Sequence, residues 1–213
     1  LAEQKLAREF NTDAHQLVDH RTWVIAGDDC LMEGICHEAA SLAGTLGLSK
    51  LICLYDDNGI SIDGEVAEWF SEDVPARFEA YGWRVIRNVN GHDAQDIRDA
   101  LGNAAESDGR PTLVCCKTVI GFGSPNKRGT AGVHGSVLGE EEIALTKAEL
   151  GWTAPAREIP ADMMAAWDQR DAGAQKQQAW QAKLDAYRAS DAVKAAEFER
   201  RMSGALAPDW SDA

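Results

Sequence analysis

Acidic and amide side chains follow two apolar segments of the sequence, and a glycine-rich run follows a third. Gly27, Asp28 and Asp29 end the first segment, residues 56–60 (Asp-Asp-Asn-Gly-Ile) end the second, and residues 121–124 (Gly-Phe-Gly-Ser) end the third. A carboxylate beside a neutral amide oxygen suits a hard divalent cation, which completes its shell with phosphate oxygens and water. Glycines let backbone N–H groups approach phosphate closely. Together these residues predict a metal-bridged diphosphate ligand.

Each motif alone has an ordinary structural explanation, because Asp-Asp and Asp-Asn-Gly are common in turns. Their positions favour a site, since ligands of open α/β sheets bind outside the carboxyl ends of the strands. Apolar runs and helical patterns alternate from Trp23 to Ile120, which is typical of βα units on a parallel sheet. Strands are predicted at residues 23–26, 51–55, 83–89 and 112–120, and helices at residues 33–46 and 73–81 and after a cap at Asp93. The sequence therefore predicts a doubly wound α/β fold with a mainly parallel sheet.

The composition changes beyond Ser136. An amphipathic helix at residues 140–150 is closed by Gly151, the usual residue just past a helix end. Its acidic start at residues 140–142 is predicted to be solvated. Residues 1–151 are predicted to form the diphosphate-binding domain, and residues 152–213 a helical C-terminal extension that leads toward a following domain.

Composition excludes some classes of partner. The chain has 213 residues and a formal charge of −14, which repels nucleic-acid phosphates and anionic membrane surfaces. No apolar run approaches the roughly 18 residues of a spanning helix. The five cysteines show no CxxC spacing, so we predict buried, reduced thiols in a cytoplasmic protein. Because the chain begins at Leu1 without an initiator methionine, we expect it to be part of something longer.

Longer stretches resemble transketolase of the bacterial type. Gly27-Asp28-Asp29 followed by Asp57-Asn58 is similar to the thiamine diphosphate signature, in which a GDG motif precedes a distant asparagine. Further similar stretches lie at residues 31–39, 41–44, 55–64, 78–83, 120–127 and 150–152. The resemblance covers nearly the whole chain and matches the later part of the family's N-terminal, diphosphate-binding domain. It implies the thiamine diphosphate-binding fold.

The resemblance also implies roles for single residues. Asp28 would ligate Mg²⁺ or Ca²⁺ through its carboxylate, Asn58 through its side-chain oxygen, and Ile60 through its main-chain carbonyl. Gly27 and Asp29 would line the diphosphate.

Four more residues match family positions. Ile62 and Ile120 would pack against the thiazolium and neighbouring rings, where the residues alone suggest plain core packing. His134 would contact the diphosphate and the reacting carbon of the sugar. Glu33 would belong to a carboxylate network that joins two active sites of a homodimer. The other four histidines are expected to be structural or solvent-facing.

Two positions depart from the family pattern. Asp29 stands where the signature usually has Gly, and a carboxylate there would repel an anion by about 1 kcal/mol in water. If the backbone needs a positive φ, Asp is also less suited than Gly. Ala131 stands where the bacterial pattern usually has a second histidine.

The function implied by the resemblance is transfer of a two-carbon ketol unit from a ketose phosphate to an aldose phosphate. It implies a cytoplasmic homodimer of the pentose phosphate pathway that uses thiamine diphosphate and Mg²⁺ or Ca²⁺. The family's acid that activates the cofactor lies outside this chain, so the fragment alone is expected to be inactive. Two alternatives stay open: a non-catalytic or split-gene dimerising subunit with a weakened cofactor site, and another enzyme of the superfamily, such as a deoxyxylulose-phosphate or dihydroxyacetone synthase.

Overall fold

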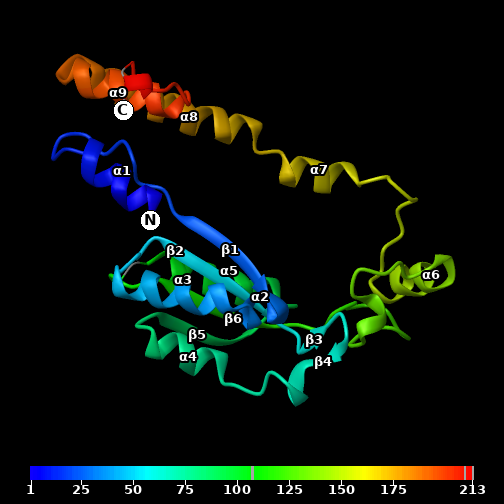
Figure 1. Cartoon of the computed structure of the whole chain (residues 1–213). Helices are drawn as coiled ribbons and strands as arrows, with labels where there is room; N and C mark the ends of the chain where they lie inside the picture. The colour runs from blue at the N-terminus through cyan, green and yellow to red at the C-terminus, as the bar shows by residue number, and fades with distance from the viewer. Residues whose placement is uncertain (107, 209, 213) are drawn as a thin grey trace. The chain divides into compact units, whose positions relative to one another are not determined.

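A computed structural model describes residues 1–106, 108–208 and 210–212. The chain divides into two compact units (Figure 1): the sheet unit, Arg21–Thr153, and the helical unit, Leu1–His20 with Ala154–Ala213. This division places the first twenty residues with the C-terminal helices, whereas the sequence grouped them with residues 21–151. The reason is a shared core, in which Phe10, Leu17 and Val18 pack with Leu184 and Phe198.

Four parallel strands form the central sheet in the order β1-β2-β6-β5. Their bounds are Thr22–Gly27 for β1, Leu51–Asp57 for β2, Thr112–Lys117 for β6 and Arg84–Asn90 for β5. Gly27 pairs with Asp56, and Asp57 with Lys117, so the ends of β1, β2 and β6 share one edge. The predicted last strand extended to Ile120. It ends earlier because the Val119 N–H bonds to His92 Nε2 (2.8 Å).

Helices cover both faces of this sheet. Ala40 and Ala43 of α3 (Gly34–Thr45) and Phe78 of α4 (Val74–Ala80) pack on one face, in a core that includes Tyr55, Leu113 and Cys115. Ala100 and Ala104 of α5 (Ala94–Ala105) pack with Ile52 and Val114 in a separate core. Strand side chains alternate between faces, which places α5 on the opposite side. The predicted α/β fold with a parallel sheet is confirmed.

The helix predicted at residues 33–46 is present, but the larger residues of its apolar pattern, which recurs at spacings of three and four, face away from the core. Ile35, Leu42 and Leu46 are exposed by 73%, 52% and 40%. Small residues form the packed face instead. A Cβ added at Gly44 would lie 1.8 Å from the carbonyl oxygen of Tyr81, so close packing selects Ala and Gly on that side.

Shorter elements complete the sheet unit. They are α2 (Asp28–Met32), β3 (Ile60–Ser61), β4 (Gly64–Glu65), the 3₁₀ turns Val66–Glu68 and Ala131–Val133, and α6 (Glu140–Glu149). The predicted caps are confirmed: Asp93 accepts the N–H groups of Gln95 and Asp96, and Gly151 follows α6 with a φ of 65°.

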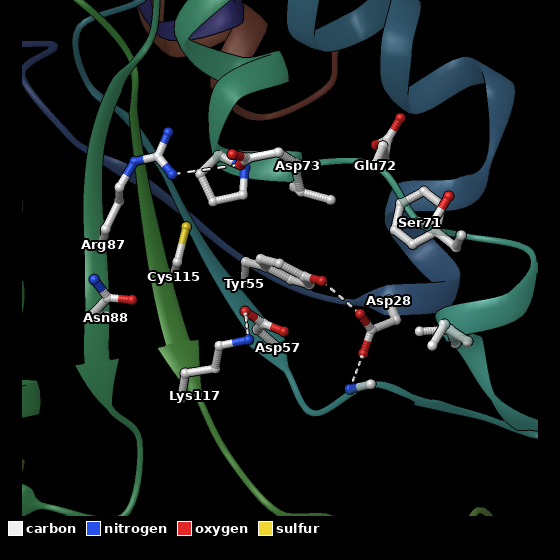
Figure 2. A pocket seen from close by; sticks show the side chains of 16 residues that line it. Asp28, Tyr55, Asp57, Ser71, Glu72, Asp73, Arg87, Asn88, Cys115 and Lys117 are labelled. Carbon is white, nitrogen blue, oxygen red and sulfur yellow. Dashed lines mark hydrogen bonds and ion pairs between the residues drawn. The ribbon is translucent and has the colours of Figure 1, made fainter.

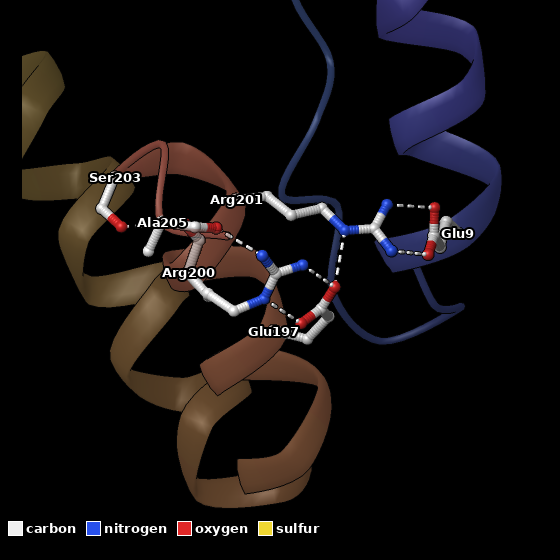
Figure 3. A network of polar contacts seen from close by, with 6 residues as sticks. All are labelled: Glu9, Glu197, Arg200, Arg201, Ser203 and Ala205. Carbon is white, nitrogen blue, oxygen red and sulfur yellow. Dashed lines mark hydrogen bonds and ion pairs between the residues drawn. The ribbon is translucent and has the colours of Figure 1, made fainter. Parts of the chain in front are cut away.

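The helical unit contains α1 (Ala2–Phe10), α7 (Ala161–Trp167), α8 (Arg170–Ser190), α9 (Ala192–Met202) and a 3₁₀ turn, Trp210–Asp212. Arg201 on α9 pairs with Glu9 on α1 (2.7 Å) and with Glu197 one helical turn back (2.7 Å), as Figure 3 shows. Within the described residues, no helix is both long and apolar enough to span a membrane.

Candidate functional site

Asp28 is a buried carboxylate at the junction of β1 and α2, where 3% of the residue is exposed. Its Oδ1 accepts a hydrogen bond from the Tyr55 hydroxyl (2.5 Å), and its Oδ2 accepts one from the Gly59 N–H (2.9 Å). Figure 2 shows the Tyr55 hydroxyl pointing at the carboxylate. Tyr55 comes from the middle of β2 and Gly59 from the turn that follows it. The paired strands β1 and β2 therefore fix the carboxylate against the turn at residues 58–60.

Asn58 occupies the same turn. Its Oδ1 accepts a hydrogen bond from the Ile60 N–H (2.9 Å), and its Nδ2 donates one to Asp56 (3.2 Å). Asp28 and Asn58 thus bind the N–H groups of consecutive residues, 59 and 60. Asp28 thus contacts the turn that carries Asn58, and Ile60 in the same turn is buried at 7% exposure. That Asp28 and Asn58 share one ion stays a prediction.

The edge of the sheet around this turn is acidic. Asp57 pairs with Lys117 (2.6 Å), and Asp56 accepts a hydrogen bond from the Thr118 hydroxyl. Asp28 takes part in no ion pair within the part of the chain that the structure describes. Buried carboxylates are normally paired with a cation or coordinate a metal. The hydroxyl beside Asp28 stays neutral, because burial, and then the hydrogen bond to Asp28, raise the pKa of Tyr55.

The space next to Asp28 leaves room for a ligand. A Cβ added at Gly27 or Gly59 would meet no protein atom within 4 Å. The backbone requires glycine at position 59, where φ is 71°, but the protein's own packing does not demand it at Gly27. No three His, Cys, Asp or Glu side chains converge on a metal-sized point in the described residues. The donors predicted for this site are of another kind, namely one carboxylate, one amide and one main-chain carbonyl, which would suit a cation that keeps water or phosphate ligands.

Asp29 and His134 face each other. The Asp29 Oδ2 lies 3.5 Å from the His134 Nε2, while the buried His134 Nδ1 has no hydrogen-bond partner among the described residues. Asp29 lies in α2 and is not among the residues with a positive φ, so its substitution for glycine causes no backbone strain. Of the two costs expected from Asp29, backbone strain and repulsion of a bound anion, only the repulsion by its negative charge remains.

The other predicted residues are less enclosed. Ile62 is 66% exposed, which is incompatible with the plain core packing that its residue type alone suggests, and Ile120 is partly buried. Glu33 is exposed and stands just before α3, where its side chain makes no capping hydrogen bond.

A cavity of about 550 Å³ adjoins the carboxylate (Figure 2). Asp28, Tyr55, Asp57 and Gly59 line its inner side, and Arg87 and Asn88 of β5 line another. Asn88 is one of two non-glycine residues with a positive φ (60°) in the described chain, at the irregularity where the β5–β6 register shifts.

Glu142 is a buried, hydrogen-bonded acid that the sequence did not predict. The acidic start of α6 was expected to be solvated, and for Glu142 this is wrong, because only 7% of the residue is exposed. It accepts hydrogen bonds from the Ser124 hydroxyl and from the backbone N–H and side-chain amide of Asn126 (both 2.9 Å). No spacing rule distinguishes it from the two exposed glutamates before it.

Comparison with known proteins agrees with this geometry. Residues 1–207 match the family model described as "Transketolase, thiamine diphosphate binding domain". The chain is 59% identical over 212 residues to transketolase 1 of Aliivibrio fischeri, covering 100% of this chain and 32% of that protein. It is 56% identical over 211 residues to transketolase 2 of Xanthobacter flavus, covering 99% of this chain and 31% of the relative.

Solved structures show the same fold. Transketolase from Leishmania mexicana superposes with a TM-score of 0.93 at 42% identity, covering 98% of this chain and 32% of that one. Transketolase from Pichia stipitis in complex with sedoheptulose 7-phosphate gives a TM-score of 0.92 at 39% identity, covering 100% and 32%. The chain spans about a third of the length of these relatives. With a matching domain model over nearly its whole length, this chain belongs to the transketolase family, as a thiamine diphosphate-binding domain.

Proposed function

We propose that this chain binds a divalent metal, Mg²⁺ or Ca²⁺, through the Asp28 carboxylate, the Asn58 side-chain oxygen and the Ile60 carbonyl. The observation that carries the proposal is a buried carboxylate with no cation from the described protein, set against the turn that holds the other two donors. Burying a charge without such a partner is costly. A bound cation would satisfy Asp28 and attract the diphosphate of the cofactor to this acidic edge.

The cofactor's diphosphate would then lie along Gly27 and Asp29, near His134. When bound, thiamine diphosphate supplies the nucleophilic carbon that accepts a two-carbon ketol unit. The chain's own residues would bind and orient the cofactor and the sugar. Ile62 and Ile120 would offer apolar surface to the rings, and the partly exposed His134 would contact the diphosphate and the sugar.

The activity proposed for the whole protein is that of a transketolase of the pentose phosphate pathway, with ketose and aldose phosphates as substrates. We place it in the cytoplasm. Since the chain spans about a third of its relatives, we propose that it supplies the diphosphate and metal site and is inactive alone.

A homodimer is part of this proposal. Trp23, Val24 and Ile25 of β1 and Ile35 and Leu42 of α3 are exposed, and exposed apolar surface of this kind is typical of interaction sites. Glu33, just before α3, would join the carboxylate network between the two active sites.

Calorimetric titration of the intact protein with thiamine diphosphate and Mg²⁺ tests the site. Asp28→Asn keeps the shape of the side chain and should lower affinity by more than about tenfold, the loss typical of groups that merely support a metal ligand. Asp99→Asn makes the same charge change at an exposed position on α5 and should bind like the unmodified protein. Equal affinities for the two variants would refute the metal site.

A second candidate function, a non-catalytic or split-gene dimerising subunit, is favoured by one observation. The Asp29 carboxylate faces His134 at the expected diphosphate position. If the site has weakened, Asp29→Gly should tighten cofactor binding strongly. An unchanged dissociation constant in that variant, together with ketol transfer between xylulose 5-phosphate and ribose 5-phosphate, would support the enzyme instead.

A further inference from the structure

The loop that carries His134 runs from Thr118 to Gly139, and we call it the His134 loop. It leaves the end of β6 and enters α6 at Glu140. Few of its residues belong to regular structure, so its shape depends on specific contacts. Ser124 is its most enclosed polar residue, at 1% exposure.

Glu142 is the polar group of α6 on which this loop rests. The exposed Glu140 and Glu141 precede it, while Glu142 is buried. It is the third residue of α6, a position from which Glu often bonds back to the helix start. Here the carboxylate bonds the loop instead, accepting the Ser124 hydroxyl and both N–H donors of Asn126. Hydrogen bonds to a charged acceptor are the stronger kind.

From Ser124 and Asn126 the contacts continue toward His134. The Lys127 N–H donates to the Ser124 hydroxyl oxygen (3.1 Å), and the Lys127 ammonium donates to the Leu138 carbonyl (2.7 Å). The Gly129 N–H donates to the Ile120 carbonyl (2.8 Å). The two Lys127 bonds hold the ends of the segment from Lys127 to Leu138 to each other and to Ser124. This segment contains His134.

Close packing at two glycines also links the His134 loop to itself and to the end of α6. A Cβ added at Gly121 would lie 3.0 Å from Val133, the neighbour of His134, and one at Gly123 would lie 2.7 Å from Leu150. The loop is therefore in close contact with itself beside His134 and with residues at the end of α6.

We propose that Glu142 is a positioning residue for the active site, which fixes the His134 loop on α6 and thereby places His134 and Ile120 against the cofactor and the sugar. This inference rests on the proposed function and deepens it. Glu142 touches neither ligand. It acts through Ser124, Asn126 and Lys127.

Three variants of the intact protein test this role. Glu142→Gln keeps the size of the side chain but removes its negative charge, so the hydrogen bonds from Ser124 and Asn126 lose their charged acceptor. Asn126→Asp added to it returns a carboxylate to the pair, facing the new NH₂ donor. Glu141→Gln makes the same charge change one residue earlier, on an exposed side chain, and serves as the matched control.

Two measurements are made on each variant: hydrogen exchange of residues 118–139, and kcat and KM for a ketose phosphate. In Glu142→Gln the exchange of loop amides should rise roughly tenfold, as expected for loss of a small part of a domain's stability. The value of kcat/KM should fall by up to about a hundredfold, the effect of a small misplacement of reacting groups. The double variant should recover both quantities, and Glu141→Gln should change neither.

Unchanged loop exchange in Glu142→Gln would overturn the proposal. So would faster exchange with kcat/KM equal to that of Glu141→Gln, because Glu142 would then be structural only. If the unmodified protein neither binds thiamine diphosphate nor transfers ketol units, the proposed function fails, and the exchange data still decide whether Glu142 holds the loop.

Discussion

At the scale of single residues, Asp28 is held by Tyr55 from one side and by the Gly59 N–H from the other. Tyr55→Phe removes one donor and leaves a buried acceptor partly unsatisfied. We expect a loss of about 1–3 kcal/mol of unfolding free energy, measured by chemical denaturation without added metal. The control is Tyr187→Phe, because the Tyr187 hydroxyl is buried without a hydrogen-bond partner in the described residues. That change should be neutral or stabilising, and similar losses in both variants would contradict this account.

The cysteines give a second prediction at this scale. Cys30 is exposed, contrary to the expectation that all five thiols are buried, whereas Cys53 and Cys115 are enclosed. Burial raises the pKa of both to about 12, and the thiolate is the reactive form. Iodoacetamide at about pH 8 should therefore label Cys30 first and these two only after unfolding, as peptide mass spectrometry can follow. Early labelling of Cys53 would contradict the burial.

At the scale of elements, the contact between α3 and the end of α4 depends on a missing side chain. Gly44→Ala would place a Cβ 1.8 Å from the Tyr81 carbonyl oxygen, and such overpacking typically costs about 1–3 kcal/mol. Gly102 in α5 has nothing within 4 Å, so Gly102→Ala should stabilise by about 1 kcal/mol through helix propensity. Thermal unfolding should move in opposite directions for these two variants. A lower midpoint in both would argue against the packing at Gly44.

The attachment of the His134 loop to α6 should depend on pH. Hydrogen bonds from Ser124, and then from Asn126, lower the pKa of Glu142 below its ordinary value of 4.5. A lowered pKa in the folded state means that the stabilisation is complete above the ordinary value and is lost as the pH falls through the folded one. Protection of residues 118–139, measured relative to the intrinsic exchange rate at each pH, should thus be lost at a higher pH than protection of β2. In Glu142→Gln this additional acid sensitivity should be absent.

At the scale of the whole molecule, each compact unit has its own core. Phe10 is 1% exposed and packs against Phe198, with ring centroids 5.2 Å apart. Phe10→Ala should destabilise the helical unit by about 3–5 kcal/mol, while Trp167→Ala at an 85% exposed position should change stability by less than about 0.5 kcal/mol. Hydrogen exchange should show lost protection in α8 and α9 and unchanged protection in β1–β6. Equal loss in the sheet strands would mean that the two units unfold together.

The sequence by itself determined the parallel α/β fold, the caps at Asp93 and Gly151 and the family, because these depend on local periodicity and on residues in short motifs. It also predicted that Asp28 lies beside the turn that follows β2, since the carboxyl ends of parallel strands share one edge, and the Gly59 N–H bond to Asp28 agrees with this. Only the tertiary structure decided which face of α3 is packed and that Glu142, rather than its two acidic neighbours, is buried. It also decided that Asp29 carries no backbone strain and that the first twenty residues pack with the last helices. Those outcomes depend on contacts between segments far apart in the chain, which no local pattern encodes.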